Sequence, residues 1–228
     1  MKANSDQHLQ GDIRVLVVGG NPIARAGLRS SLNASGITVA GESSGGAEAI
    51  ACAIQTRPDV VLTYASLPDM SGMEATAHVK QAVPTARVIV LSDDAHPTWL
   101  RAAIEAGAAG SLAMGQPVAD AIRLVSEGGS LVDTEELTQM ARNGGPESRV
   151  GTEGRMALSE LSPRELEVLG HIAEGATNRQ IAEQMHYSIG TIRNVVHRLA
   201  QKLQVSDRTQ AAILAIRAGL STRSQQTP

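Results

Sequence analysis

The sequence predicts an α/β domain built on a doubly wound five-stranded parallel sheet, followed by an all-α domain of four helices. Short apolar runs alternate with helical patterns up to about residue 128, which indicates successive βαβ units. Runs such as VLVV, DVVL and VIVL are apolar at consecutive positions, as expected of strands that helices cover on both faces. After residue 157 the strand pattern disappears and clear helix caps replace it.

Each expected strand is a short apolar run between two helical segments. The runs lie at 15–18, 39–40, 60–62, 88–91 and 111–113. Proline and glycine separate them from the helices, because proline favours helix starts and glycine favours helix ends. Such residues are Pro22, Gly36, Gly45, Pro58, Pro84, Pro97, Gly107 and Pro117.

Length and composition predict a globular protein of two domains. The chain has 228 residues, of which 42% are hydrophobic and 19% charged, so each half is long enough to bury a core. No apolar run approaches the roughly 18 residues of a membrane-spanning helix, and the polar start lacks a signal-peptide core. We therefore expect a cytoplasmic protein without membrane attachment. The single cysteine, Cys52, is interpreted as a buried packing residue.

Changes in composition predict the domain boundaries. Residues 1–11 are expected to be a disordered N-terminus and 12–135 the sheet domain. Residues 136–157 contain NGGPESRVGTEG, a mixture of glycine, proline, serine and charge that is typical of a linker. The helical domain is predicted over 158–221, and a flexible tail over 222–228.

The four helices of the second domain are predicted from their N-caps. Ser162 and Glu165 form a capping box, with proline at the first helical position between them. The same N-cap pattern recurs at Thr177 with Gln180, at Ser188, and at Asp207 with Gln210.

The third of these helices is predicted to have one apolar and one basic side. Its expected core stripe consists of Ile192, Val196, Leu199 and Leu203. The opposite side carries Gly190, Arg193, Asn194, His197 and Gln201, with Arg198 at its edge. A basic face is often only a solvated surface, and the whole chain has a net charge of -3. However, residues 188–204 contain no acid, and a brief turn separates this helix from the preceding one, which indicates a helix-turn-helix.

A family resemblance adds to this interpretation. It is carried by LSPRELEVLGHIAEGATNRQIAEQMHYSIGTIRNVVHRLAQKLQVSDRTQAAILAIRAGL, which closely resembles the LuxR-type effector domain of NarL/FixJ response regulators. The resemblance implies double-stranded DNA as partner, with the third helix in the major groove. It also implies a homodimer formed largely through the fourth helix, Asp207–Ala218, and therefore paired half-sites.

The resemblance also implies roles for individual residues. Arg193 and Asn194 match the base-contacting pair, and His197 matches a further contact in the groove. Residues expected to approach phosphates are Thr191, Arg198, Lys202 and Thr209. Arginine suits a guanine edge and asparagine an adenine edge. The chain departs from the family at Ile189 and Val195, so its sequence preference is expected to differ.

The first 130 residues resemble the receiver domain of the same regulators, through IRVLVVGGNPIARAGL, RPDVVLTYASLPDMSGMEA, RVIVLS and AGAAGSLAMGQP. In that family, an acid pair and an aspartate hold Mg²⁺ and accept phosphate, and a lysine stabilises the product. Here the matching positions are Gly19, Gly20, Tyr64 and Met114. Ser92 matches the switch hydroxyl, and Ser111 replaces the aromatic switch residue.

These replacements predict an atypical receiver that cannot be phosphorylated. Mg²⁺ prefers hard oxygen ligands, including carboxylates, which glycine and a neutral phenol do not supply. We expect no metal, no cofactor and no enzymatic activity, and a cognate histidine kinase is doubtful. Asp69, Asp93 and Asp94 lie in nearby loops and are interpreted as solvated charges.

Several alternatives for control and function stay open at this point. Ligands of open α/β sheets bind beyond the carboxyl ends of the strands, so a small-molecule effector is one hypothesis. That site would comprise Gly19, Gly20, Asn21, Tyr64, Ser92 and Met114. Alternatively, Tyr64 and Met114 fill the vacated pocket and the receiver serves dimerisation only. A flavodoxin-like cofactor protein is disfavoured because GGNPIARAG lacks the GxGxxG spacing. A non-DNA-binding adaptor is disfavoured by the intact basic face.

Overall fold

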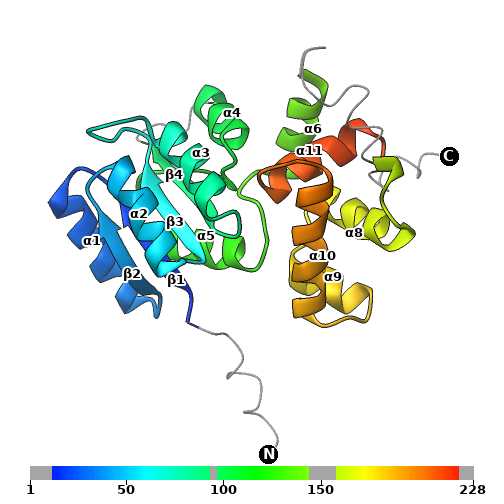
Figure 1. Ribbon diagram of the computed structural model, residues 1–228, viewed down its shortest axis with the longest axis horizontal. Coiled ribbons are helices and arrows are strands. Elements are labelled where there is room, and N and C mark those ends of the chain that lie inside the picture. The colour runs from blue at the N-terminus through cyan, green and yellow to red at the C-terminus, as the bar shows by residue number, and fades with distance from the viewer. Residues whose placement is uncertain (1–11, 93–96, 144–157, 221–228) are drawn as a thin grey trace, which may run out of the picture.

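The computed structural model describes residues 12–92, 97–143 and 158–220. Figure 1 shows a sheet covered by helices at the left and a group of helices at the right. The predicted disordered N-terminus, 1–11, and the predicted tail, 222–228, lie outside the described residues. None of the described helices is both long and apolar enough to cross a membrane.

The sheet is five-stranded and parallel, as the sequence predicts. Its order is β2-β1-β3-β4-β5. The strands are β1 (Arg14–Val18), β2 (Thr38–Ser43), β3 (Val60–Tyr64), β4 (Arg87–Ser92) and β5 (Gly110–Ala113). All five expected runs fall within these strands. Because β1 and β3 are neighbours although β2 lies between them in sequence, the strand order reverses there and the sheet is doubly wound.

Helices cover both faces of the sheet. They are α1 (Pro22–Ala34), α2 (Gly46–Thr56), α3 (Gly72–Ala82), α4 (Pro97–Glu105) and α5 (Val118–Ser126). One buried cluster joins Leu16 and Val90 of the sheet to α2, α3 and α4, and the other joins Val17 and Leu62 to α1 and α5. This burial explains why consecutive strand positions are apolar.

The C-terminal part is helical. Helix α6 (Thr134–Asn143) is followed by α8 (Pro163–Ala173), α9 (Asn178–Gln184), α10 (Ile189–Lys202) and α11 (Arg208–Arg217). The predicted linker, 136–157, therefore begins inside α6, and its residues 144–157 lie outside the described part. Because Leu137 is buried in the core that also includes α8, α10 and α11, α6 belongs to the packed structure. Because α6 is mostly polar, its sequence did not indicate that it packs into this core.

The predicted caps are confirmed. The Ser162 side chain accepts from the Glu165 amide at 3.3 Å, while a Glu165 carboxylate oxygen accepts from the Ser162 amide at 2.9 Å. Thr177 and Gln180 form a second capping box. Asp207 caps α11, but the Gln210 side chain accepts from Ser206 and does not return to Asp207.

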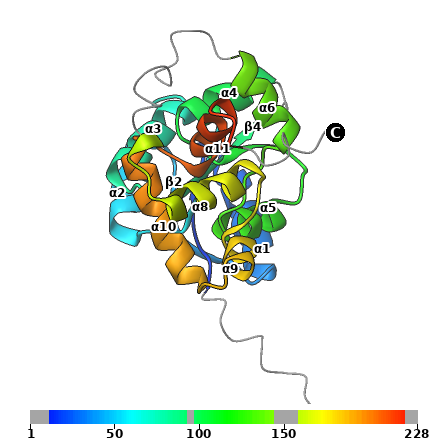
Figure 2. The ribbon, with the colours of Figure 1, turned by 90° about the vertical axis from the view of Figure 1, so that its right-hand side faces the viewer.

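The core side of α10 differs from its prediction by one residue. Ile192, Leu199 and Leu203 are buried as expected, but Val195 is also buried and Val196 is only half-buried. The apolar stripe therefore runs closer to Val195 than its spacing suggested. Figure 2 looks onto this part of the molecule, where α10 packs with α8 and α9.

An ion pair ties the start of α8 to the end of α10. Lys202 Nζ lies 2.9 Å from a Glu165 carboxylate oxygen. The hydrogen bond from Lys202, together with that from the Ser162 amide, lowers the pKa of Glu165 to about 2 from its ordinary 4.5. A carboxyl whose pKa falls on folding stabilises the fold above its unfolded pKa, and this contribution is lost as the pH falls towards the folded value.

We predict that Glu165→Gln lowers the free energy of unfolding at pH 7 by about 1 kcal/mol. Between pH 4.5 and 2, the wild type should lose more stability than the variant, because only the wild type protonates Glu165 there. Chemical denaturation across this pH range measures both effects. Glu105→Gln is the control, since Glu105 forms an exposed pair with Arg101. Equal pH dependence in wild type and Glu165→Gln would contradict the assignment.

Candidate functional sites

The polar side of α10 is open to solvent. Arg193, Asn194, His197 and Arg198 are all exposed, whereas Ile192 on the opposite side is fully buried. In the part of the chain that the structure describes, no side-chain hydrogen bond or ion pair engages Arg193, Asn194 or Arg198. His197 lies 3.2 Å from the side-chain nitrogen of Gln201 on the same face. The predicted face therefore exists as one exposed surface on α10, and Arg193, Asn194 and Arg198 point their donors to solvent.

The turn between α9 and α10 fixes the direction of α10. His186 adopts a left-handed conformation, with φ of 57°, which ends α9 abruptly. Ser188 then caps α10 by accepting from the Thr191 amide at 3.1 Å. The guanidinium of Arg164 lies 3.8 Å from the centroid of the Tyr187 ring, a cation–π contact that holds the turn against α8. This is the geometry of a helix-turn-helix.

The chemistry of this face suits a polyanion. No acid occurs between Gln184 and Asp207, so the field around α10 is locally positive although the chain is acidic overall. Arginine offers paired donors for phosphate or guanine, and asparagine can donate and accept at adenine. Thr191, whose hydroxyl lies 2.8 Å from that of Ser188, is half-buried at the start of the helix.

Two residues of the predicted DNA-contacting set are engaged elsewhere. Lys202 forms the ion pair with Glu165 described above, although its side chain stays 40% exposed. Thr209 is completely buried, and its hydroxyl lies 3.3 Å from that of Ser130 in the sheet domain. The structure therefore places Thr191, Arg193, Asn194, His197, Arg198 and Lys202 on α10, with Lys202 paired to Glu165 at its end. Thr209 is buried on α11, apart from them.

A tyrosine ring occupies the carboxyl end of the sheet. Tyr64 ends β3, and its ring lies so close to Gly19 that a Cβ at position 19 would be 2.5 Å from Tyr64 Cδ2. Gly20 is equally close to Pro68, where a Cβ would lie 2.8 Å from the ring Cγ. At both positions the neighbouring ring takes the space of a Cβ, so an acidic side chain there would force Tyr64 or Pro68 to move.

A hollow of about 300 Å³ lies beside this ring. Its lining consists of Gly20, Asn21, Tyr64, Ser66, Leu67 and Pro68. Three members of the predicted ligand site are not part of it: Gly19, Ser92 and Met114. Asn21 is engaged as the N-cap of α1, accepting from the Ile23 amide at 2.9 Å. Met114 is 48% exposed, so the expectation that it fills the vacated pocket is wrong.

Asp69 is not simply a solvated charge, as the sequence suggested. Its carboxylate accepts from the amides of Gly46 and Ala47 at 2.8 and 3.0 Å, at the start of α2. These bonds lower the pKa of Asp69. Asp93 and Asp94 lie outside the described residues. Among the residues that are described, no group of three histidine, cysteine, aspartate or glutamate side chains could hold a metal ion.

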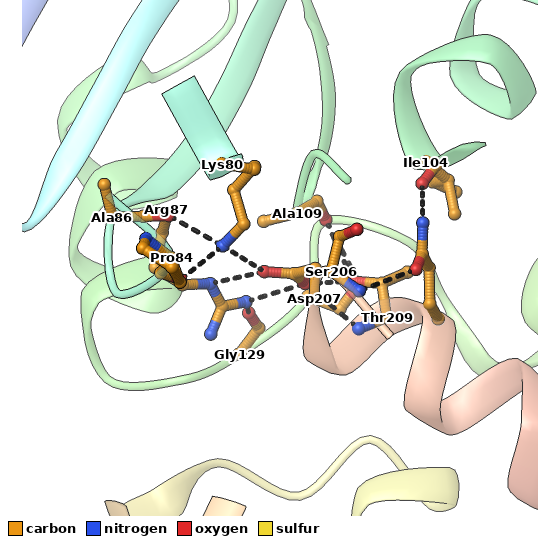
Figure 3. A network of polar contacts seen from close by, with 12 residues as sticks. Lys80, Pro84, Ala86, Arg87, Ile104, Ala109, Gly129, Ser206, Asp207 and Thr209 are labelled. Atoms are coloured by element: carbon orange, nitrogen blue, oxygen red, sulfur yellow. Dashed lines mark hydrogen bonds and ion pairs between the residues drawn. The ribbon is translucent and has the colours of Figure 1, made fainter. Parts of the chain in front are cut away.

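Sequence analysis missed a polar contact between the two domains. Figure 3 shows Lys80 and Arg87 of the sheet domain pointing toward Asp207, the N-cap of α11. No motif identifies this contact, because its partners are 120 positions or more apart in sequence. In the structure Lys80 is a buried lysine on α3, on the same side as the buried residues Thr76 and Val79.

Both domains match families of known proteins. Residues 15–115 match the family described as "Response regulator receiver domain". Residues 159–215 match "Bacterial regulatory proteins, luxR family". The first match runs from β1 to just past β5, and the second runs from just before α8 into α11. Their order along the chain agrees with the predicted organisation.

Similar proteins extend over nearly the whole chain. A transcriptional regulatory protein, YxjL of Bacillus subtilis (strain 168), is 34% identical over 91% of this chain and 97% of its own length. The response regulator VraR of Staphylococcus aureus (strain Mu3 / ATCC 700698) is 35% identical over 91% of this chain and 98% of its own. The structure of two RcsB dimers bound to two parallel DNAs has a TM-score of 0.50 at 22% identity, covering 92% of this chain and all of that chain.

We predict that Gly19→Asp lowers the free energy of unfolding by about 1–3 kcal/mol, because the new side chain overlaps the Tyr64 ring. Combined with Tyr64→Ala, it should cost less than the sum of the two single variants. Denaturant unfolding of the three proteins measures this coupling. Gly27→Asp is the control, since a Cβ at Gly27 meets nothing within 4 Å. Strict additivity would contradict the close packing.

Proposed function

This chain belongs to the response regulators that combine a receiver domain with a LuxR-type DNA-binding domain, and we propose that its control does not depend on phosphorylation of the receiver. The proposed function is sequence-specific regulation of transcription by a protein that binds double-stranded DNA as a homodimer. Activity would be set by a small molecule, by a partner protein or by abundance.

The single observation that carries this proposal is the Tyr64 ring against Gly19. The receiver family places carboxylates at the matching positions, and here the side chains of Tyr64 and Pro68 occupy the space that a carboxylate at position 19 or 20 would need. Mg²⁺ requires hard oxygen ligands, so Gly19, Gly20 and Tyr64 do not fit the ion. No phosphorylation step can be derived from these residues, and the proposed control acts through other contacts.

A small-molecule effector is supported by the hollow beside Tyr64. Its walls include Leu67, Pro68 and the tyrosine ring, which suit an apolar or aromatic compound better than phosphate. A purely structural receiver is supported by the same ring, because Tyr64 also packs against both apolar clusters of the sheet. Calorimetry with candidate metabolites on wild type and Tyr64→Ala distinguishes the two hypotheses. An effector site predicts a heat of ligand binding in the wild type that Tyr64→Ala loses, whereas a structural receiver predicts no heat of binding in either.

DNA recognition is proposed to follow the exposed face of α10. Arg193 and Asn194 are assigned to base edges, with His197 as a further contact in the groove. Thr191 and Arg198 are assigned to phosphates, and Lys202 and Thr209 would join them after leaving their present partners. The RcsB structure contains dimers on DNA, which supports paired half-sites for this chain.

We predict that the full-length protein selects a paired-site motif from a random DNA pool without any phosphodonor. Acetyl phosphate or phosphoramidate should change its DNA affinity by less than about twofold at one fixed salt concentration, which must be stated because phosphate contacts dominate affinity. Tyr64→Asp is the matched variant. It supplies a carboxylate at position 64 but still lacks the acid pair at positions 19 and 20, so it should not be phosphorylated either. A phosphorylated wild type with altered affinity would refute the proposal.

Arg193→Ala should weaken specific binding by about 1–3 kcal/mol and relax discrimination at one base position. Competition binding against single-base variants of the selected site measures both effects. Arg101→Ala, which removes an exposed arginine from α4, is the control and should leave affinity and selectivity unchanged. If Arg193→Ala retains wild-type affinity and selectivity, Arg193 does not read a base.

A further inference from the structure

A buried carboxylate joins the two domains. The Asp207 side chain is 1% exposed, and its Oδ2 lies 3.1 Å from Arg87 Nε and 3.9 Å from Lys80 Nζ. Both cations belong to the receiver, whereas Asp207 caps α11 by accepting from the Thr209 amide at 3.0 Å. Figure 3 shows the three side chains converging. One carboxylate therefore serves the DNA-binding fold and the domain interface together.

The two cations are held in place by the receiver itself. Lys80 Nζ donates to the carbonyls of Pro84 and Ala86 at 2.8 and 2.9 Å, and Arg87 donates to the Gly129 carbonyl at 3.1 Å. Burial lowers the pKa of Lys80 to about 8, although Asp207 acts in the opposite direction. Burial would also raise the pKa of Asp207, but Arg87 and Lys80 hold it below its ordinary value.

Further contacts surround this centre. Gln210 donates to the Ile104 carbonyl at 2.7 Å, and the Asn178 amide donates to the Glu127 carbonyl at 3.0 Å. Gly107 and Gly128 let the two backbones approach. A Cβ at Gly107 would lie 2.8 Å from Ser206 Cβ, and one at Gly128 would lie 2.5 Å from Asn178 Nδ2. Both glycines also have positive φ, so other residues would be strained there.

The interface covers α11 and leaves the reading face of α10 open. Every residue from Asp207 to Arg217 is buried or half-buried, with α8 on one side and α6 and α4 on others. Thr209, assigned above to a DNA phosphate, is completely buried. The interface also lies at the amino ends of β4 and β5, where Arg87 and Gly110 begin the strands, and not at the end that holds Tyr64.

We propose that Asp207, with Lys80 and Arg87, forms an interdomain latch that withholds the first turn of α11 from DNA and must open before the full phosphate contact forms. This inference rests on the proposed DNA-binding function. Because Thr209 cannot contact the receiver and a DNA phosphate at the same time, closure of the latch and complete DNA binding compete. Weakening the latch is therefore expected to increase DNA affinity.

The test uses the full-length chain and Asp207→Asn. Asparagine is as good an N-cap as aspartate, so α11 keeps its cap while Lys80 and Arg87 lose their carboxylate. Asp120→Asn is the control for net charge, because Asp120 forms an exposed pair with Arg123 on the receiver. In the Asp207→Asn variant Lys80 is a buried cation without its carboxylate partner. Adding Lys80→Met replaces that cation by an uncharged side chain of similar volume, so the interface should return towards its wild-type stability.

Two measurements decide the proposal. Hydrogen exchange without DNA, followed in peptides covering residues 104–110, 127–131 and 206–212, should become about tenfold faster in Asp207→Asn and stay unchanged in Asp120→Asn. Affinity for the motif selected by the wild type should rise about tenfold in Asp207→Asn only, a change equivalent to about 1.4 kcal/mol. The double variant should lie between Asp207→Asn and the wild type in both.

Unchanged exchange in Asp207→Asn would overturn the latch, and so would faster exchange with unchanged or weaker DNA affinity. If Asp207→Asn does not fold, Arg87→Gln weakens the same contact from the receiver side and must shift both measurements in the same direction. If neither wild type nor variants select any DNA motif, the proposed function fails, while exchange still shows whether Asp207 holds the domains together.

Discussion

The arrangement of the two domains depends on one charge that is hidden from water. A carboxylate removed from solvent is stable only when cations and hydrogen-bond donors replace its hydration, and Asp207 obtains both from opposite sides. The receiver supplies Arg87 and Lys80, and the first turn of α11 supplies the Thr209 amide. One residue therefore serves both the first turn of α11 and the contact between the domains.

Close packing fills the carboxyl end of the receiver sheet. The resemblance to receiver domains implies acids at the positions of Gly19 and Gly20, and the space that such side chains would need is taken by Tyr64 and Pro68. Tyr64 also contributes to the apolar clusters on both sides of the sheet. In this chain Gly19 and Gly20 are therefore matched to Tyr64 and Pro68, because a Cβ at either glycine would overlap the neighbouring ring.

The sequence predicted the elements well because local chemistry determines them. Apolar runs located all five strands, and hydroxyl and carboxyl caps located α8 to α11. Helix α6 was missed because its burial comes from α11, more than sixty positions away along the chain. The same reason explains Thr209: a threonine after a cap has the same local pattern whether it faces DNA or, as here, a serine of another domain.

The carboxyl end and the amino end of the receiver sheet have different consequences for control. The hollow beside Tyr64 lies beyond the carboxyl ends of the strands, whereas Arg87, Ala109 and Gly129 meet the DNA-binding domain at or near the amino ends. Coupling between them requires an element with two arrangements that both sites bias. Helix α4 joins the sheet to the domain interface, because it packs on the sheet through Ala103 and its Ile104 carbonyl accepts from Gln210 of α11. A ligand at the Tyr64 end would act on DNA binding only by moving such an element, whereas a partner that binds the amino ends would act on the latch directly.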